Sequence, residues 1–196
     1  MTTVDFWFDP GCPFTWATSR WLVEVAAVRD LDITWRPMSL AVLNADRDIP
    51  ERYRQVMAAA GRRVRIMPAV QAVGGNAAVG DFYTAFGRLV HDAGEDGDRA
   101  IGLALASAGM PESLAAAVDD ESYDPVIRYS HAEGQRRVGT DSGSPIVAID
   151  GGPAFFGPVV APTPAGDDAL RLYDALVSIS GVAQFSELKR GRQAIA

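Results

Sequence analysis

The sequence predicts an α/β fold in which a helical region interrupts a sheet. Near the N-terminus, two short apolar strands flank one helix, which is the pattern of a βαβ unit. Residues 49–139 then lose the strand pattern and become rich in alanine at helical spacing, and strand patterns return from residue 140. We therefore predict the first half of a sheet domain over 1–48, an inserted helical subdomain over 49–139 and the second half over 140–196.

The first strand is predicted over residues 4–8. Val4, Phe6 and Phe8 alternate along it, and Trp7 makes the opposite face apolar as well. This pattern is typical of a strand that is covered on both faces. We expect it to be buried.

A turn and a long helix follow the first strand. Asp9-Pro10-Gly11 is a turn sequence. Pro13 suits the first helical position, because the N–H that proline lacks would have no partner inside the helix. The helix is predicted to end near Arg29, and a second strand is predicted over residues 33–36. Cys12 is thereby placed at or beside the N-cap of the helix.

That position favours a reactive cysteine. The first turn of a helix directs unpaired N–H groups and a positive dipole end toward the residue before it, which stabilises a thiolate. Cys12 is the only cysteine, so no intramolecular disulfide can form. The alternative is a buried, inert cysteine that packs as a small apolar residue. The Thr15 hydroxyl, in the first helical turn, could reach the Cys12 sulfur or simply cap the helix.

The inserted region is predicted to contain several helices. One begins at Pro50 and ends at Gly61, and the next, Arg62 to Val73, is expected to kink or break at Pro68. Gly74-Gly75-Asn76 is interpreted as a loop. In the second half of the sheet domain, two strands joined by a turn and one last helix are predicted, over 146–149, 153–156 and from Asp167 onward.

The active-site segment carries a resemblance to a known family. Strand, Cys-Pro-aromatic-x and helix together resemble the DsbA-like branch of the thioredoxin superfamily. Phe6-Trp7-Phe8-Asp9-Pro10, Ser19-Arg20-Trp21 and Met38-Ser39-Leu40 look specifically like the actinobacterial mycothiol-dependent nitroreductase group. More distantly, residues 12–16 look like the Ser-Pro-Tyr-Ser segment of kappa-class glutathione transferases and 2-hydroxychromene-2-carboxylate isomerases. Thr15 stands where most DsbA-like enzymes carry a second cysteine.

The resemblance implies a thioredoxin-like α/β fold with an inserted all-helical subdomain. In such folds a cis-proline that begins a strand faces the active-site cysteine, and Ser144-Pro145 before an apolar run matches that pattern. The backbone of Ser144 would then hold an extended ligand that carries a thiol. The implied catalytic residues are Cys12 and Thr15. The residues expected to bind substrate or thiol are Pro13, Phe14, Trp16, Ser144 and Pro145.

The predicted function is thiol-dependent redox chemistry at Cys12. With no tightly bound cofactor, a low-molecular-weight thiol such as mycothiol, or one resembling glutathione, would act as cosubstrate and resolve the mixed species. The substrate would be a disulfide or an electrophile. One alternative is a transferase or isomerase of the kappa type, in which the Cys12 position stabilises the thiolate of a bound thiol. A second is a binding module without catalysis.

Composition excludes several other classes. A net charge of −7 argues against nucleic acid and anionic membrane surfaces as partners. With one cysteine and two histidines, a His/Cys metal site is not expected. The sequence starts directly with a strand pattern and not with a signal peptide, and a lone cysteine fits a reducing compartment, so we expect a cytoplasmic protein. Whether it is a monomer or a homodimer is left open.

Overall fold

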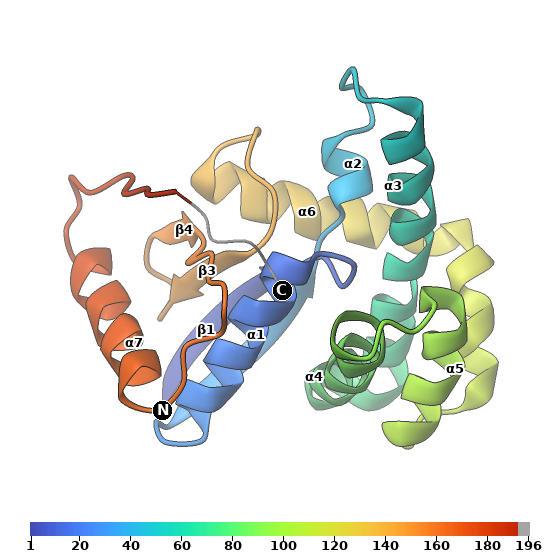
Figure 1. Cartoon of the computed structure of the whole chain (residues 1–196), viewed down its shortest axis with the longest axis horizontal. Coiled ribbons are helices and arrows are strands. Elements are labelled where there is room, and N and C mark those ends of the chain that lie inside the picture. The colour runs from blue at the N-terminus through green and yellow to red at the C-terminus, as the bar shows by residue number, and fades with distance from the viewer. Residues whose placement is uncertain (192–196) are drawn as a thin grey trace.

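The computed structural model describes residues 1–191. Helices and strands alternate at the two ends of the chain, and helices alone fill the middle (Figure 1). The elements are β1 (Thr2–Phe8), α1 (Pro13–Ala26), β2 (Leu31–Pro37), α2 (Leu40–Leu43), α3 (Glu51–Val64), α4 (Ile66–Gly87), the π-helical turn η1 (Arg88–Asp92), α5 (Gly97–Ser107), the 3-10 helices η2 (Glu112–Asp119) and η3 (Glu121–Tyr123), α6 (Asp124–Val138), β3 (Ile146–Ile149), β4 (Ala154–Phe156) and α7 (Asp167–Ser180).

One four-stranded sheet has the strand order β2-β1-β3-β4. β1 and β2 are parallel and joined by α1, so the predicted βαβ unit is confirmed. β3 runs antiparallel to β1, and β4 returns antiparallel to β3. The first strand is thus central, and Phe6 lies between Trp35 of β2 and Val147 of β3. This position leaves β1 without a free edge.

Helices cover both faces of the sheet. In Figure 1, α1 and α7 lie in front of the strands and α6 runs behind them. On the front face, the Trp21 indole N–H of α1 donates to the Ala169 carbonyl of α7 at 2.9 Å. On the back face, the Trp7 ring packs so closely on α6 that a Cβ at Gly134 would lie 2.9 Å from it.

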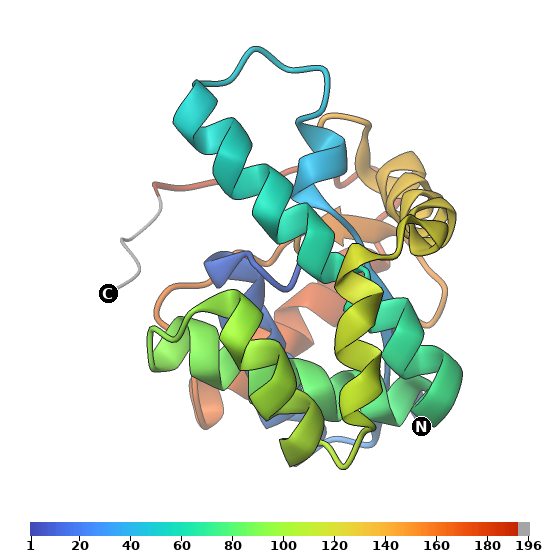
Figure 2. The same cartoon turned by 90° about the vertical axis from the view of Figure 1, so that its right-hand side faces the viewer.

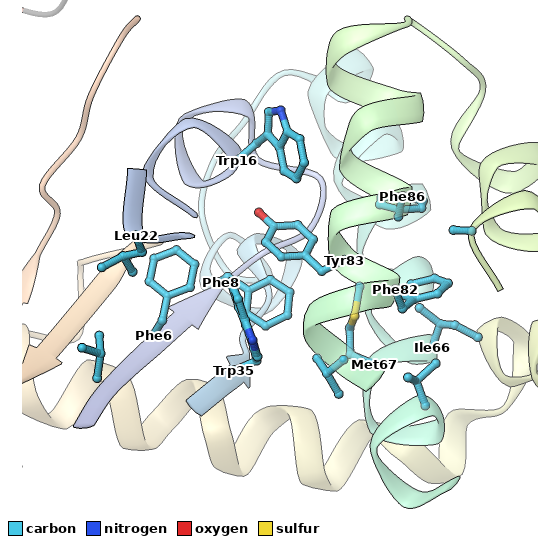
Figure 3. Close-up of a cluster of buried hydrophobic side chains, with 14 of the residues drawn as sticks. Phe6, Phe8, Trp16, Leu22, Trp35, Ile66, Met67, Phe82, Tyr83 and Phe86 are labelled. Atoms are coloured by element: carbon cyan, nitrogen blue, oxygen red, sulfur yellow. The ribbon is translucent and has the colours of Figure 1, made fainter. Parts of the chain in front are cut away.

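The main core continues from the sheet into the helical region. Figure 3 shows the rings of Phe8 and Trp35 meeting Tyr83, which reaches across from α4. The ring centroids of Phe8 and Tyr83 are 4.4 Å apart, and those of Trp35 and Tyr83 are 5.8 Å apart. Because these rings share one core, the sheet and the inserted helices hold each other in place. Figure 2 shows α3, α4 and α5 from the side of this helical region.

Of the three boundaries predicted in the first part of the helical region, the end at Gly61 is wrong, and the other two are shifted or reduced to a kink. α3 passes Gly61 and ends at Val64; glycine is needed there because a Cβ would lie 2.6 Å from that of Ala41. The break expected at Pro68 falls three residues earlier, at Arg65, because proline is tolerated in the first turn of α4. The predicted loop at 74–76 is a kink within α4, where Gly75 has φ 71°.

The second half of the sheet domain follows the sequence expectation. β3, β4 and α7 fall within a residue or two of the predicted ranges. α6, which we assign to the helical insertion, packs on the sheet, so the boundary at residue 139 stays a prediction. Residues 192–196 of the third predicted segment lie outside the described residues. Among residues 1–191, no helix combines the length and apolar character needed to cross a bilayer.

Candidate active site

Cys12 occupies the N-cap of α1, as the sequence predicts. Its backbone is extended (φ −90°, ψ 116°), and Pro13 begins the helix. The Cys12 carbonyl already accepts the N–H of Trp16 at 2.9 Å, which closes the first helical turn. The side chain is 8% exposed. The sulfur is therefore placed at the positive end of the α1 dipole, with restricted access to solvent.

A buried carboxyl group holds the turn before Cys12. Asp9 is 1% exposed, and its two oxygens accept the backbone N–H groups of Gly11 at 2.8 Å and Leu40 at 2.6 Å. The Asp9 carbonyl also accepts the Cys12 N–H at 3.1 Å. Burial raises the pKa of Asp9 to about 6, although the two N–H bonds favour the carboxylate. Asp9 therefore joins the active-site turn to the start of α2.

Thr15 and Ser144 meet beside this turn. The Thr15 hydroxyl, which is fully buried, donates to the Ser144 hydroxyl at 2.8 Å. The Ser144–Pro145 peptide bond, expected to be cis, is cis. The structure thus brings the predicted loop to the first turn of α1. The Thr15 proton is given to Ser144 and not to the Cys12 sulfur, and a part for either residue in the chemistry stays a prediction.

The other predicted site residues differ in exposure. Pro13 is exposed and Phe14 is partly exposed, so both lie at the surface beside Cys12. Trp16 is buried, and its indole N–H donates to Asp92 at 2.8 Å. The Arg20 guanidinium covers the Trp16 ring at 4.1 Å from the centroid. Trp16 therefore contributes packing beneath the cysteine, and contact with a ligand stays a prediction for it.

The π-helical turn η1 supplies residues that the sequence did not indicate. His91 Nε2 lies 2.9 Å from the Pro10 carbonyl, which requires that Nε2 carry the proton and donate. Burial lowers the pKa of His91, so the ring stays neutral. Asp92, the next residue, accepts the Trp16 indole N–H. Together they tie η1 to the active-site turn at Pro10 and to α1 at Trp16.

Sequence reasoning could not find this contact, because nothing near His91 in the chain links it to the active-site turn. His91 and Asp92 stand in an ordinary amphipathic stretch, 81 and 76 residues from their partners Pro10 and Trp16. π-Helical turns often occur at functional sites, but no local pattern in this stretch announces one.

The fold and the cysteine site together define a DsbA-like, thiol-dependent oxidoreductase with a thioredoxin fold. The chain belongs to the Rv2466c-like family, described as mycothiol-dependent nitroreductase Rv2466c, whose model matches residues 11–190. The resemblance stated from the active-site segment is thereby confirmed. So is the expectation of an enzyme family that works with a thiol.

Known proteins support both the family and the fold. The chain is 33% identical over 195 residues to Rv2286c of Mycobacterium tuberculosis, covering 97% of this chain and 82% of that protein. The structure of 2-hydroxychromene-2-carboxylate isomerase superposes with a TM-score of 0.61 at 16% identity, covering 90% of this chain and 95% of that one. The probable DsbA oxidoreductase SCO1869 of Streptomyces coelicolor gives 0.58 at 19% identity, covering 96% and 94%. These two structures share the predicted fold.

Proposed function

We propose that the chain is a monothiol oxidoreductase in which Cys12 exchanges disulfides with the help of mycothiol. The proposal rests on which residues occupy the N-cap and the first turn of α1. The nucleophile position holds Cys12, whereas the position three residues later holds Thr15, whose hydroxyl is committed to Ser144. A resolving sulfur must therefore come from another molecule, and the family is described by its dependence on mycothiol.

The proposed exchange has two steps. The Cys12 thiolate attacks one sulfur of a disulfide, forms a mixed disulfide with it and releases the other sulfur as a thiolate. A low-molecular-weight thiolate then attacks the substrate sulfur of this mixed disulfide. The Cys12 thiolate is released, and the small thiol leaves as a disulfide with the substrate fragment. One thiol is consumed and one is produced, so no further oxidant or reductant is needed.

The proposed ligand contacts lie around the mouth of the site. Pro13 and Phe14 offer an apolar surface beside the sulfur. Ser144 and Pro145 lie on the loop to which Thr15 is bonded, and their backbone would align an extended thiol. Trp16 would pack at the base of the ligand site. We further propose that the reaction takes place in the cytoplasm, where a reducing environment keeps a lone cysteine free. The substrate and the oligomeric state, including a homodimer, stay open.

A kappa-type transferase or isomerase is the second candidate. The fold likeness to 2-hydroxychromene-2-carboxylate isomerase and the lack of a second cysteine favour it. In this scheme Cys12 and the helix N-terminus would stabilise the thiolate of a bound thiol, and no mixed disulfide would form. The two functions therefore differ in whether a disulfide bond forms between Cys12 and the thiol.

Intact mass spectrometry tests this difference. The protein is incubated with oxidised mycothiol, and in parallel with glutathione disulfide, and weighed before and after reduction. We expect an adduct of one mycothiol that reduction removes and that Cys12→Ser abolishes. Tight binding of mycothiol without an adduct would favour the transferase. If neither an adduct nor binding of mycothiol is found, the protein is a binding module without this chemistry.

A further inference from the structure

A buried tyrosine beside Cys12 carries a hydroxyl without a partner. Tyr83 is fully buried, and its ring packs against Phe8 and Trp16, which stand four residues before and four residues after Cys12. Figure 3 shows its oxygen directed away from α4, toward α1. Within residues 1–191, this hydroxyl makes no hydrogen bond of normal geometry, although the neighbouring Ser19 hydroxyl acts to lower its pKa. A buried donor without an acceptor is costly and requires an explanation.

A second unpartnered donor lies close to the first. Arg20 of α1 uses Nη1 to donate to the Thr84 hydroxyl at 3.0 Å and Nε to donate to Ser19 at 3.2 Å. Its Nη2 is buried and has no partner in the described part of the chain. Burial lowers the pKa of Arg20 to about 10, so the guanidinium stays charged at neutral pH. Burial also raises the pKa of Tyr83 far above its ordinary range, so the phenol keeps its proton.

The two groups therefore form a buried surplus of hydrogen-bond donors with positive charge. Arginine has no acceptor atom, and the Ser19 hydroxyl, the polar neighbour of the phenol, already accepts the Arg20 Nε–H. A surplus of this kind attracts a negatively charged atom. The negative atom that the reaction creates nearby is the sulfur of Cys12, and Tyr83 is the residue whose ring bridges both flanks of that cysteine.

We propose that Tyr83 and Arg20 are positioning residues that stabilise negative charge on the Cys12 sulfur. The inference rests on the proposed function only in taking Cys12 as the thiolate. Tyr83 donates its hydroxyl proton toward the sulfur, directly or through one water molecule. Arg20 packs its guanidinium on the Trp16 ring and supplies the positive charge next to the phenol.

Other charged groups also face Tyr83 and Arg20 and contribute to the electrostatic potential around them. Asp9 faces Tyr83 from the turn before α1 and opposes negative charge there. From η1, Arg88 and Asp92 act on Arg20 with opposite signs. His91 is neutral and bonded to the Pro10 carbonyl. Since none of these groups carries an unpartnered buried donor, the specific contribution is assigned to Tyr83 and Arg20.

The test is the rate of Cys12 alkylation by iodoacetamide as a function of pH. Tyr83→Phe removes only the hydroxyl, and we expect its profile to move to higher pH by about one unit, the size of a hydrogen bond to a charged group. Arg20→Gln should move it in the same direction. Tyr173→Phe is the matched control, because Tyr173 is also buried but packs on Trp21 at the α7 interface. Its profile should coincide with that of the parent.

Two outcomes would overturn the inference: a Tyr83→Phe profile that coincides with that of the parent, or an equal displacement by Tyr173→Phe. Urea unfolding of each variant confirms that the alkylated protein is folded. The mycothiol adduct on Cys12 is measured separately. An adduct with unmoved profiles would reject this inference and leave the proposed function standing. A displaced profile without any mycothiol adduct would support this inference and reject the proposed function.

Discussion

Thr15 donates its hydroxyl proton to the Ser144 hydroxyl across 2.8 Å, and the two residues stand 129 positions apart in the chain. The bond joins the first turn of α1, which begins directly after Cys12, to the loop before β3. In DsbA-like enzymes with two cysteines, the Thr15 position would carry the resolving sulfur. In this chain the position holds a hydroxyl, which links α1 to the loop before β3.

The Thr15–Ser144 bond should contribute measurably to stability. Thr15→Val keeps the shape and removes the donor, which we expect to cost about 1 kcal/mol. Ser144→Ala removes the acceptor, and the double variant should lose less than the sum of the two. Urea unfolding of all four proteins gives the coupling free energy. Additive losses would show that the hydroxyl pair contributes nothing beyond its separate parts.

A second cysteine at residue 15 should create an internal disulfide. Cys12 is the N-cap and Thr15 is the third residue of the helix, the spacing of a Cys-x-x-Cys pair. Thr15→Cys is therefore expected to lose both free thiols under mild oxidation, as followed by thiol titration. Thr18→Cys, one turn further along α1, is the control and should keep both. Two free thiols in oxidised Thr15→Cys would mean that these side chains do not face each other.

Gly87 should tolerate no side chain, because a Cβ there would overlap the ring of Trp16. We expect Gly87→Ala to destabilise the fold by about 1–3 kcal/mol through overpacking. Gly102→Ala in α5 is the matched control, since a Cβ at that helical glycine meets no atom within 4 Å. It should stabilise the protein by up to about 1 kcal/mol. Thermal unfolding compares them, and equal shifts would contradict the close Gly87–Trp16 contact.

Asp9 should make stability fall as the pH rises through the weakly acidic range. Burial raises its pKa from 3.8 to about 6, so the folded chain binds this proton more tightly than the unfolded chain does. The resulting stabilisation is complete below pH 3.8 and is lost as the pH rises through about 6. For a shift of this size it amounts to roughly 3 kcal/mol.

Asp9→Asn isolates this effect from all other titrations. The free energy of unfolding of the parent, minus that of Asp9→Asn, should fall between about pH 4 and pH 7 and then stay level. Denaturant unfolding across that range measures the difference. A difference independent of pH would show that Asp9 has the same proton affinity in both states.

Local chemistry predicted the strand–turn–helix unit well. Val4, Phe6 and Phe8 could be assigned to a buried strand, and Pro13 to a helix start, because side-chain alternation and the missing proline N–H act within a few residues. Cys12 at the N-cap followed from the same rules. The boundary at Gly61 did not, since a glycine that packing requires inside a helix looks the same as one that ends it.

By itself, therefore, the sequence determined the fold class, the family and the place of Cys12 at the start of α1, which all depend on short motifs. Only the tertiary structure decided what surrounds Cys12. Ser144 reaches Thr15, Asp92 reaches Trp16 and Tyr83 reaches Phe8 because the shared core docks α4, η1 and the β3 loop onto one turn. Such contacts join segments more than 70 residues apart in the chain. Periodicity and capping rules describe neighbours along the chain, so they carry no information about which distant segments meet.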